Sequence, residues 1–459
     1  MASETDLWRI EQGNEFETLV RQRFPDGVLI KGGVEEAAEQ TQTVIDDGAN
    51  CLFQATAISG GCLVKVDVLK RDGDTESWKL YEVKSSTRVK DENVLDVAFQ
   101  TWVFERAGFT ISDVFVITAN STSTRVGEPD AEQFSTIHDV TEEVRDHLED
   151  LEELIEPALE VIRLAEPPAT SQHPCGLKPT ECPSSFYCYP DLPEDSVFTI
   201  PRLRFKKARK LYDEGIISLS DLHDLSLLNE KQRLYVELVK SGETHFDRDE
   251  VKSFIDHLNY PISFLDYETA SSVIPLFDGY HSHSQVVFQF SLHVIAEPGA
   301  DLQHHEFLAT GEEDPAVSFA AILQEAMPEN GSILVWNKSF EAARNREIGE
   351  RIPTTADFFK TLNERIVDLM DIVSKGHYVD PRFKGSASIK LVLPVLVPNM
   401  SYDELAVNNG SLASLRWLQM RTEDDQQQVG EIRENLLAYC RQDTLAMVEL
   451  LRAFQRLCF

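Results

Sequence analysis

The spacing of hydrophobic and polar residues changes along this chain, and the changes mark out its regions. Residues 258–459 alternate short apolar runs ("PISFLDYE", "SQVVFQFSLHVI", "GSILVW") with stretches of helical periodicity, which is typical of an α/β domain. The chain before residue 172 mixes helices with short strands and ends in the proline-rich "LAEPPATSQHP". The pattern therefore predicts four segments: a first domain at 1–172, a cysteine-bearing knot at 173–190, a helical linker at 191–257 and the α/β domain at 258–459.

One carboxylate interrupts a predicted buried stripe in the C-terminal helix "ENLLAYCRQDTLAMVELLRAF". Its apolar residues follow a spacing of four and three, at Leu436, Cys440, Met447, Leu450 and Phe454. Asp443 falls in this stripe, and a buried carboxylate is costly without a cation or a strong hydrogen-bond partner. Tyr439 lies one turn earlier on the same side. We expect Asp443 to bind a metal ion, with a structural salt bridge as the alternative.

Two further acids lie on one face of the predicted strand "PISFLDYE". Because side chains alternate along a strand, Asp266 and Glu268 share their face with Ile262 and Phe264. Carboxylates about 6–7 Å apart along a strand can hold a hard divalent cation between them. The alternative is a chance pair of acids on a solvated face.

A fourth acid belongs to "ILVWNKSFEAAR", where a strand is expected to end near Trp336. Ser339 is predicted to cap the helix that follows, which places Glu341 in its first turn. An acid there also complements the helix dipole, and this is the simpler interpretation for Glu341 alone.

A hairpin is predicted in "CLVKVDVLKRDGDTESWKLYEVKSS". If Asp67 lies opposite Glu82, the centre of the hairpin falls between Asp74 and Thr75, inside the polar turn. This register brings the two backbones to about 5 Å at the acids and sets Lys84 beside them. Two such acids can hold Mg²⁺ or Mn²⁺, and the ammonium can neutralise developing charge. The alternative is an ion-pair cluster on a wet face of the sheet.

Composition narrows the class of protein. The chain has 459 residues, 42% hydrophobic and 26% charged, as in a soluble globular protein. No apolar run approaches the roughly 20 residues of a membrane helix, and the first residues do not resemble a signal peptide, so we expect a cytoplasmic protein without membrane contact. Seven cysteines, an odd number, argue against a secreted disulfide framework. The sequence predicts no oligomeric state.

The chain is strongly acidic overall, but its charge is unevenly distributed. The net charge of −35 disfavours indiscriminate binding to nucleic acid. Two local segments are nevertheless basic: "RLRFKKARK" at 202–210 and "RFKGSASIK" at 382–390. The candidate phosphate-binding residues in them are Arg204, Lys206, Lys207, Lys384 and Lys390. An exposed helix face and a surface loop are the corresponding alternatives.

The C-terminal segment resembles the DEDD exonucleases of the ribonuclease H-like superfamily. Asp266 and Glu268 match the first motif, "NKSFE" resembles the second, and "YCRQD" resembles the third motif of the tyrosine subtype. At Glu341 the family usually has Asp. The resemblance implies that Asp266, Glu268, Glu341 and Asp443 hold two ions of Mg²⁺ or Mn²⁺, that Tyr439 positions the attacking water, and that cleavage runs 3′→5′.

The N-terminal segment resembles the PD-(D/E)xK nucleases of the RecB and Cas4-like branch. The resemblance assigns catalytic roles to Asp67, Glu82, Lys84, Gln100 and an acid in "GNEFETLV", for which Glu15 is preferred over Glu17. Asp67 and Glu82 are the implied metal ligands. Most of the chain also resembles a bacterial family of unknown function, DUF2779. Together these likenesses imply an α/β protein in which a restriction-endonuclease-like domain is joined through a helical linker to a ribonuclease H-like exonuclease domain.

Three cysteines lie close together in "HPCGLKPTECPSSFYC", following a histidine. Cys175, Cys182 and Cys188 stand among Pro and Ser, which favours metal ligation over a place in a core. Cas4-like nucleases combine three late cysteines with one near the N-terminus to hold a [4Fe–4S] cluster, but residues 1–50 contain no cysteine. Either the cluster is absent, or His173 completes a Cys₃His zinc site. Cys51 and Cys62 fit better as core residues.

These features predict a metal-dependent nuclease with two nuclease-like domains. Single-stranded DNA is the expected substrate from the Cas4-like resemblance, and an RNA exonuclease is the alternative. A nucleic-acid-binding scaffold in which one or both sites are inactive is the competing interpretation from another functional class.

Overall fold

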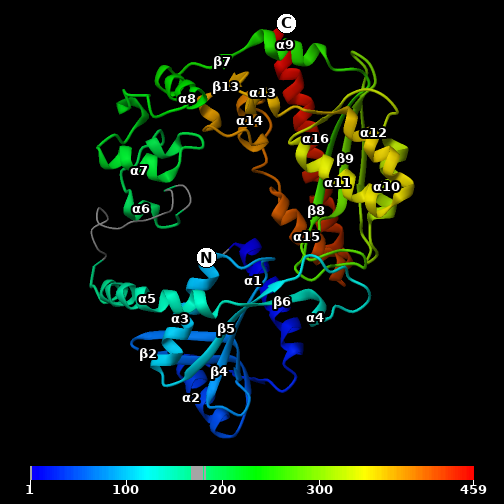
Figure 1. Ribbon diagram of the computed structural model, residues 1–459. Coiled ribbons are helices and arrows are strands. Elements are labelled where there is room, and N and C mark those ends of the chain that lie inside the picture. Colours follow the sequence, from blue (N-terminus) through cyan, green and yellow to red (C-terminus); the bar gives the residue numbers. More distant parts are fainter. Residues whose placement is uncertain (1–2, 167–178, 180–181) are drawn as a thin grey trace. The chain divides into compact units, whose positions relative to one another are not determined.

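The computed structural model describes residues 3–166, 179 and 182–459 and shows a mixed α/β protein (Figure 1). Its contacts divide it into two compact units. The N-terminal unit contains Met1–Ala169 together with Ser271–Gln285, and the C-terminal unit contains Thr170–Ala270 together with Val286–Phe459. The α/β prediction is confirmed. None of the described helices is both long and apolar enough to cross a membrane.

The N-terminal unit is built on a six-stranded mixed sheet with the order β1-β2-β3-β4-β5-β6. The strands are β1 (Val28–Leu29), β2 (Cys51–Ser59), β3 (Cys62–Arg71), β4 (Ser77–Lys84), β5 (Thr110–Ala119) and β6 (Ser135–Asp139). The helices are α1 (Glu4–Val20), α2 (Val34–Asp46), α3 (Asp91–Arg106), α4 (Ala131–Phe134) and α5 (Thr141–Ile162). Strands β2, β3 and β4 are antiparallel, whereas β4 and β5 run parallel.

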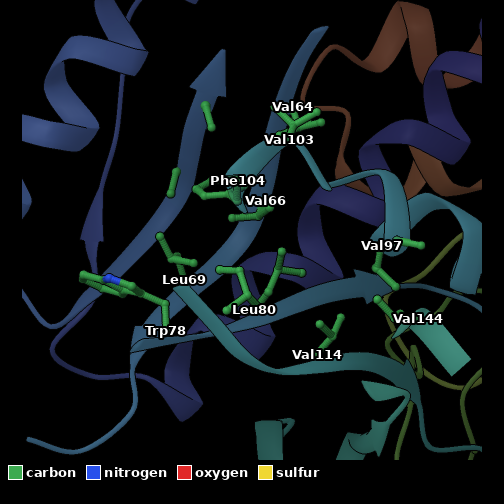
Figure 2. Packing of buried hydrophobic residues seen from close by; sticks show 14 of the residues in the cluster. Val64, Val66, Leu69, Trp78, Leu80, Val97, Val103, Phe104, Val114 and Val144 are labelled. Atoms are coloured by element: carbon green, nitrogen blue, oxygen red, sulfur yellow. The ribbon is translucent and has the colours of Figure 1, made fainter. Parts of the chain in front are cut away.

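Both faces of this sheet are covered by apolar side chains. On one face, residues of β3, β4 and β5 pack against α3 and α5, and Figure 2 shows this cluster, including Val66, Leu80, Val103, Phe104, Val114 and Val144. On the other face, Phe16 and Val20 of α1 pack with Val68 and Ile117. The acidic α5 therefore has an apolar side that is buried. Cys51 and Cys62 are buried, as expected of core residues.

The segment Ser271–Gln285 packs with the N-terminal unit, although its neighbours in sequence are strands of the C-terminal unit. Val273 is buried in the core cluster of α1. Ser272 Oγ donates to Gln12 Oε1 at 2.5 Å, and Arg125 Nη1 donates to the Pro275 carbonyl at 2.7 Å. The predicted boundary near residue 258 does not anticipate this arrangement, because strand periodicity continues on both sides of the segment.

The C-terminal unit begins with short helical pieces. They are α6 (Ser185–Cys188), α7 (Phe205–Asp213), α8 (Glu230–Ser241), the short strand β7 (His245–Phe246) and α9 (Arg248–Asp256). Gly215 takes a left-handed conformation, with φ of 85°, two residues after α7 ends, where the chain turns away from the helix. Phe198, Leu211 and Tyr235 are among the residues that form a separate small core here.

The rest of the C-terminal unit is a five-stranded sheet with helices on both faces (Figure 1). The strand order is β10-β9-β8-β11-β12. Its strands are β8 (Ile262–Ala270), β9 (Val286–Ile295), β10 (Leu302–Leu308), β11 (Ile333–Val335) and β12 (Ile366–Asp368), with β13 (Tyr378–Val379) pairing separately with β7. Its helices are α10 (Ala316–Ala326), α11 (Lys338–Arg351), α12 (Ala356–Arg365), α13 (Asp371–Ser374), α14 (Ile389–Leu396), α15 (Gly410–Thr422) and α16 (Gln426–Cys458).

The two faces of β8 pack against different helices. Leu265 and Tyr267 belong to the core that includes Phe319 of α10, Ile348 of α11 and Phe359 of α12. The long helix α16 packs on β8 and β9 (Figure 1). All five apolar residues of its predicted stripe have an exposed fraction of 0% (Leu436, Cys440, Met447, Leu450 and Phe454), which confirms that prediction.

Candidate metal centres

The first two acids of the C-terminal centre lie on the face of β8 that carries α16. Alternation along the strand places Asp266 and Glu268 opposite to Leu265 and Tyr267. Asp266 is paired across the ladder with Ser291 of β9, and Glu268 with Gln289. Glu268 is buried, with an exposed fraction of 6%.

Cys440 of α16 joins this pair of acids, which was not expected from the sequence. Its Sγ lies 3.7 Å from Asp266 Oδ2, and one ligand atom from each of Asp266, Glu268 and Cys440 lies within 4.8 Å of the others. Burial and the neighbouring carboxylates raise the pKa of the thiol, so the S–H is retained and donates toward Asp266. No other group of at least three His, Cys, Asp or Glu residues is this compact in the described part of the chain.

Asp443 is held by hydroxyl groups. Tyr402 donates its phenolic O–H to Asp443 Oδ1 at 2.6 Å, and Tyr439 also hydrogen-bonds this carboxylate. The two rings are edge to face, with centroids 6.2 Å apart. Burial nevertheless raises the pKa of Asp443 to about 6. Tyr402 lies 41 positions before Asp443, in a loop, and no local pattern marks it.

Glu341 reaches the same centre from the first turn of α11. Strand β11 runs parallel to β8, and α11 begins three residues after β11 ends. Glu341 is almost fully buried, and its Oε2 has no hydrogen-bond partner among the described residues. Burial, followed by the charge of Asp368, raises its pKa to about 8.

The predicted cap at Ser339 is wrong. Asn337 is the N-cap of α11 and has a left-handed backbone, with φ of 93°, and Ser339 Oγ donates to its Oδ1 at 2.6 Å. The first N–H groups are bound from outside the helix: Asp368 accepts from the N–H of Asn337 at 3.1 Å and of Lys338 at 2.8 Å. A carboxylate from the neighbouring strand β12 therefore replaces a local cap.

The four acids of the C-terminal centre repel one another. Burial raises the pKa of Asp266 well above its ordinary value, and the charges of Asp443, Glu268 and Glu341 raise it further. The pKa of Glu268 is raised for the same reasons. Buried carboxylates with excess negative charge, one of which has an oxygen without a hydrogen-bond partner among the described residues, are the ligand set of a hard divalent cation, so these residues fit Mg²⁺ or Mn²⁺.

Lys390 is the cation that the structure places at this centre. Lys390 lies in the first turn of α14, and its charge lowers the pKa of Glu268 and of Asp443. Its Nζ lies 5.5 Å from the ring centroid of Tyr402 and 5.4 Å from that of Tyr439. Lys384, the other lysine predicted in this segment, is exposed in a left-handed turn, with φ of 52°.

The N-terminal centre lies on the hairpin of β3 and β4, in the register that the sequence predicts. The pairs Val68↔Tyr81 and Leu69↔Leu80 set Asp67 opposite Glu82. Asp67 Oδ2 accepts the N–H of Val83 at 2.7 Å. Burial and the charges of Glu82 and Glu17 raise the pKa of Asp67 well above its ordinary value.

Lys84 bonds directly to the acids of this centre. Its Nζ donates to Glu82 Oε1 at 2.8 Å and to Asp96 Oδ2 at 2.6 Å. Gln100 on α3 is buried, lies close enough to lower the pKa of Glu82, and donates to Asp96 Oδ1 at 3.4 Å. Asp96 lies one helical turn before Gln100 on α3 and was not among the predicted site residues. Glu82 Oε2 is buried without a hydrogen-bond partner among the described residues, as an open ligand position would be.

The preference for Glu15 over Glu17 is not supported by their placement. Glu15 accepts from Gln12 Nε2 at 2.8 Å along α1. Glu17 instead accepts from Gln54 Nε2, which also donates to Asp67. Residues two apart on a helix point about 200° away from each other, and the packing of α1 turns Glu17 to the centre.

The cysteine-rich stretch and the first basic segment hold the remaining predicted residues. His173 and Cys175 lie outside the described residues, whereas Cys182 and Cys188 are partly exposed free thiols. Arg204 is the N-cap residue of α7. Lys206 and Lys207 are exposed on the first turn of that helix.

The chain has partial similarity to proteins of unknown role. Residues 263–388 match the family model described as "Domain of unknown function (DUF2779)". The match contains Asp266, Glu268 and Glu341 but ends before Tyr439 and Asp443. It covers less of the chain than the resemblance in the sequence implied. No solved structure matches the chain.

Two curated proteins are similar over part of their length. An uncharacterized protein of Ureaplasma parvum serovar 3, UU173, is 30% identical over 210 residues, which cover 40% of this chain and 30% of that protein. An uncharacterized MG366 homologue of Mycoplasma pneumoniae is 29% identical over 206 residues, covering 41% of this chain and 31% of that protein. The chain therefore spans less than a third of the length of either relative.

Proposed function

We propose that this protein is a divalent-metal-dependent nuclease that shortens single-stranded DNA, with one centre in each unit. In this proposal the C-terminal unit is a ribonuclease H-like exonuclease of the DEDD type, and the N-terminal unit is a nuclease of the PD-(D/E)xK type. The observation that carries it is the convergence of Asp266, Glu268, Glu341 and Asp443, from three different elements, on one buried centre. Keeping four mutually repelling acids there is destabilising unless a cation binds them.

The chemistry of the centre suits phosphodiester hydrolysis. Divalent ions bound by these acids would activate water and stabilise the leaving oxygen of a phosphodiester. Burial and nearby acids raise the pKa of Tyr439, which keeps its O–H protonated and able to orient a water molecule. The ammonium of Lys390 lies near the acids that would hold the metal ions. It could therefore bind an oxygen of a phosphate placed at those ions.

Two basic segments support a nucleic-acid substrate despite the acidic chain. Pro201 directly precedes the basic run 202–210 and packs closely on Gly385. A Cβ atom added at Gly385 would lie only 2.1 Å from the ring of Pro201. Gln232 also donates to the Pro201 carbonyl at 2.9 Å. Arg202 and Gly385 line one cavity of about 220 Å³. The segments that carry Arg204, Lys206, Lys207 and Lys384 are therefore neighbours, and 382–390 leads on to Lys390. Such a patch can bind the backbone of a single strand.

The test is cleavage of a 5′-labelled single strand, as DNA and as RNA, with Mn²⁺ or with EDTA. The wild type is compared with Asp266→Asn and with Glu82→Gln. Shortening that requires metal and is lost in one variant assigns the chemistry to that unit. Asp249→Asn and Glu350→Gln, which change exposed acids of α9 and α11, are matched controls and should cleave as the wild type does.

Two results would redirect the proposal. Shortening of RNA alone would make the protein an RNA exonuclease. If the wild type cleaves neither strand but binds both, and the Asn and Gln variants bind equally well, the protein is a nucleic-acid-binding scaffold whose sites are inactive.

A further inference from the structure

Gln54 of β2 joins two acids of the N-terminal centre through a single amide group. Its Nε2 donates to Glu17 Oε1 at 2.5 Å and to Asp67 Oδ1 at 3.0 Å. A primary amide has two N–H donors, and here one goes to each carboxylate. Gln54 is therefore the side chain that links α1 to the acid of β3.

The backbone at Gln54 is unusual for a strand. Its φ is 58°, in the left-handed region, which a residue other than glycine, asparagine or aspartate seldom adopts. The β2–β3 ladder pairs Phe53 with Val68 and Ala55 with Val66 but leaves out Gln54. A left-handed residue of this kind is strained and persists only where its surroundings require it.

The acids that Gln54 joins repel each other. The charge of Glu17 raises the pKa of Asp67, in addition to burial and Glu82. With Gln54 on Oδ1 and the N–H of Val83 on Oδ2, both oxygens of Asp67 are fixed in direction. Glu17 is fixed by Gln54 and by Arg21, whose Nη2 donates to Oε1 at 2.6 Å.

We propose that Gln54 is a positioning residue of the N-terminal metal centre, where it holds Glu17 and Asp67 in place for a divalent cation. This inference rests on the proposed function only in requiring that the centre binds metal. Because its carboxamide is neutral, Gln54 aligns the acids without adding a further negative charge. The strain at φ 58° then serves to bring the amide between the two carboxylates.

The test measures Mn²⁺ binding by calorimetry, without nucleic acid, on the full chain. Asp266→Asn and Asp443→Asn are introduced first, so that the C-terminal centre does not dominate the signal. In that background, Gln54→Ala should weaken binding of Mn²⁺ about 10–100-fold, as is typical when a side chain that orients a ligand is removed. Asp67→Asn, which changes a direct ligand, should weaken it at least as much.

Gln54→Glu separates positioning from a structural role. It has the same shape but replaces the donor with a carboxylate, so the variant should melt below the background in EDTA. Mn²⁺ should then raise its melting temperature by more than it raises that of the background, because the added acid becomes available to the cation. A purely structural hydrogen bond predicts a loss that is equal with and without Mn²⁺.

The strain has its own control. Arg202, in the C-terminal unit, also has a left-handed backbone, with φ of 55°, and Arg202→Gly relieves it away from the N-terminal centre. This change should leave the affinity for Mn²⁺ unchanged, whereas Gln54→Gly should weaken it as Gln54→Ala does.

Two outcomes would overturn the inference, and they differ in what else they remove. An unchanged affinity in Gln54→Ala, in a background that binds Mn²⁺ through Asp67, overturns the role of Gln54 alone. If the background binds no Mn²⁺ that Asp67→Asn or Glu82→Gln weakens, the N-terminal centre is not a metal site, and its part of the proposed function falls too. Cleavage by the C-terminal unit is unaffected by either outcome.

Discussion

The two candidate metal centres balance their negative charge in different ways. In the N-terminal centre Lys84 forms ion pairs with both Glu82 and Asp96. In the C-terminal centre no ion pair reaches any of its four acids within the described residues, and Lys390 acts from a greater distance, over two tyrosine rings. If both centres bind a cation as proposed, we expect that cation to contribute more to the stability of the C-terminal centre than to that of the N-terminal one.

The largest expected effect is loss of cleavage when one acid of the C-terminal centre is neutralised. Asp443→Asn should lower metal-dependent cleavage by more than about a hundredfold, beyond what removal of an orienting partner causes. The same variant should be more stable than the wild type in EDTA, because a repelled carboxylate is gone. Gel assays and urea unfolding measure the two effects. Equal stability of both proteins in EDTA would contradict the proposed charge imbalance.

The second prediction concerns pH in the absence of metal. Since the pKa of Asp443 is raised to about 6 and that of Glu341 to about 8, the folded protein binds protons more tightly than the unfolded chain. The stabilisation is full below the ordinary pKa values of 3.8 and 4.5 and is lost as the pH rises from there through the folded values. About half of the Asp443 contribution is already lost by pH 5. Unfolding in EDTA at about pH 5 and pH 8.5 should therefore show a fall that comes mostly from Glu341, and Mn²⁺ should abolish it.

The measured quantity is the difference between the wild type and the double variant Asp443→Asn, Glu341→Gln. This subtraction is needed because His293 of β9 also titrates, and its effect on stability changes with pH in the opposite direction. Burial lowers its pKa from 6.5 to about 4, so it adds stability as the pH rises between those values. Parallel pH profiles in the two proteins would show that the acids do not titrate as proposed.

The two tyrosines on Asp443 provide a smaller and more selective test. Tyr402→Phe removes the O–H that donates to Oδ1 and should weaken binding of Mn²⁺ about tenfold. Tyr439→Phe should lower the rate of cleavage more than the affinity for Mn²⁺, if its O–H orients water. Calorimetry and single-turnover kinetics distinguish the variants, and the reverse pattern would exchange the roles of the tyrosines.

The smallest effects are expected at the basic patch. Lys207→Ala and Lys384→Ala should each flatten the salt dependence of single-strand binding by about 0.7 in log–log slope for a lost phosphate contact. Lys360→Ala, an exposed lysine of α12, is the matched control. Slopes identical in all three variants would exclude the patch from the binding surface.

The features that were predicted correctly from the sequence depend on residues close together in the chain. The register of Asp67 and Glu82 follows from one hairpin and its turn, and the buried stripe of α16 follows from a single period. The features that were not predicted depend on a hydrogen-bond partner from a distant part of the chain. Asp368 caps a helix that Ser339 was expected to cap, and Tyr402 reaches Asp443 from a loop, so no local spacing encodes either contact.

The choice between two acids on α1 shows a subtler limit. Glu15 and Glu17 both flank the apolar residues that pack on the sheet, so periodicity alone allows either to face the centre. Gln54 decides between them, but its role depends on a left-handed backbone inside a strand, which sequence patterns do not indicate. Sites built on such local exceptions are visible only once the tertiary structure is known.

The segment Ser271–Gln285 makes the N-terminal unit discontinuous in sequence, and this affects any attempt to divide the protein. A fragment that stops at Ala169 lacks Val273, whose side chain fills the core against α1. A fragment that starts at residue 170 keeps the segment but loses the surface on which it packs. Limited proteolysis or expression of either half should therefore give aggregation-prone pieces. Gene fusions or domain exchanges will preserve both units only if they carry this insertion together with the first 169 residues.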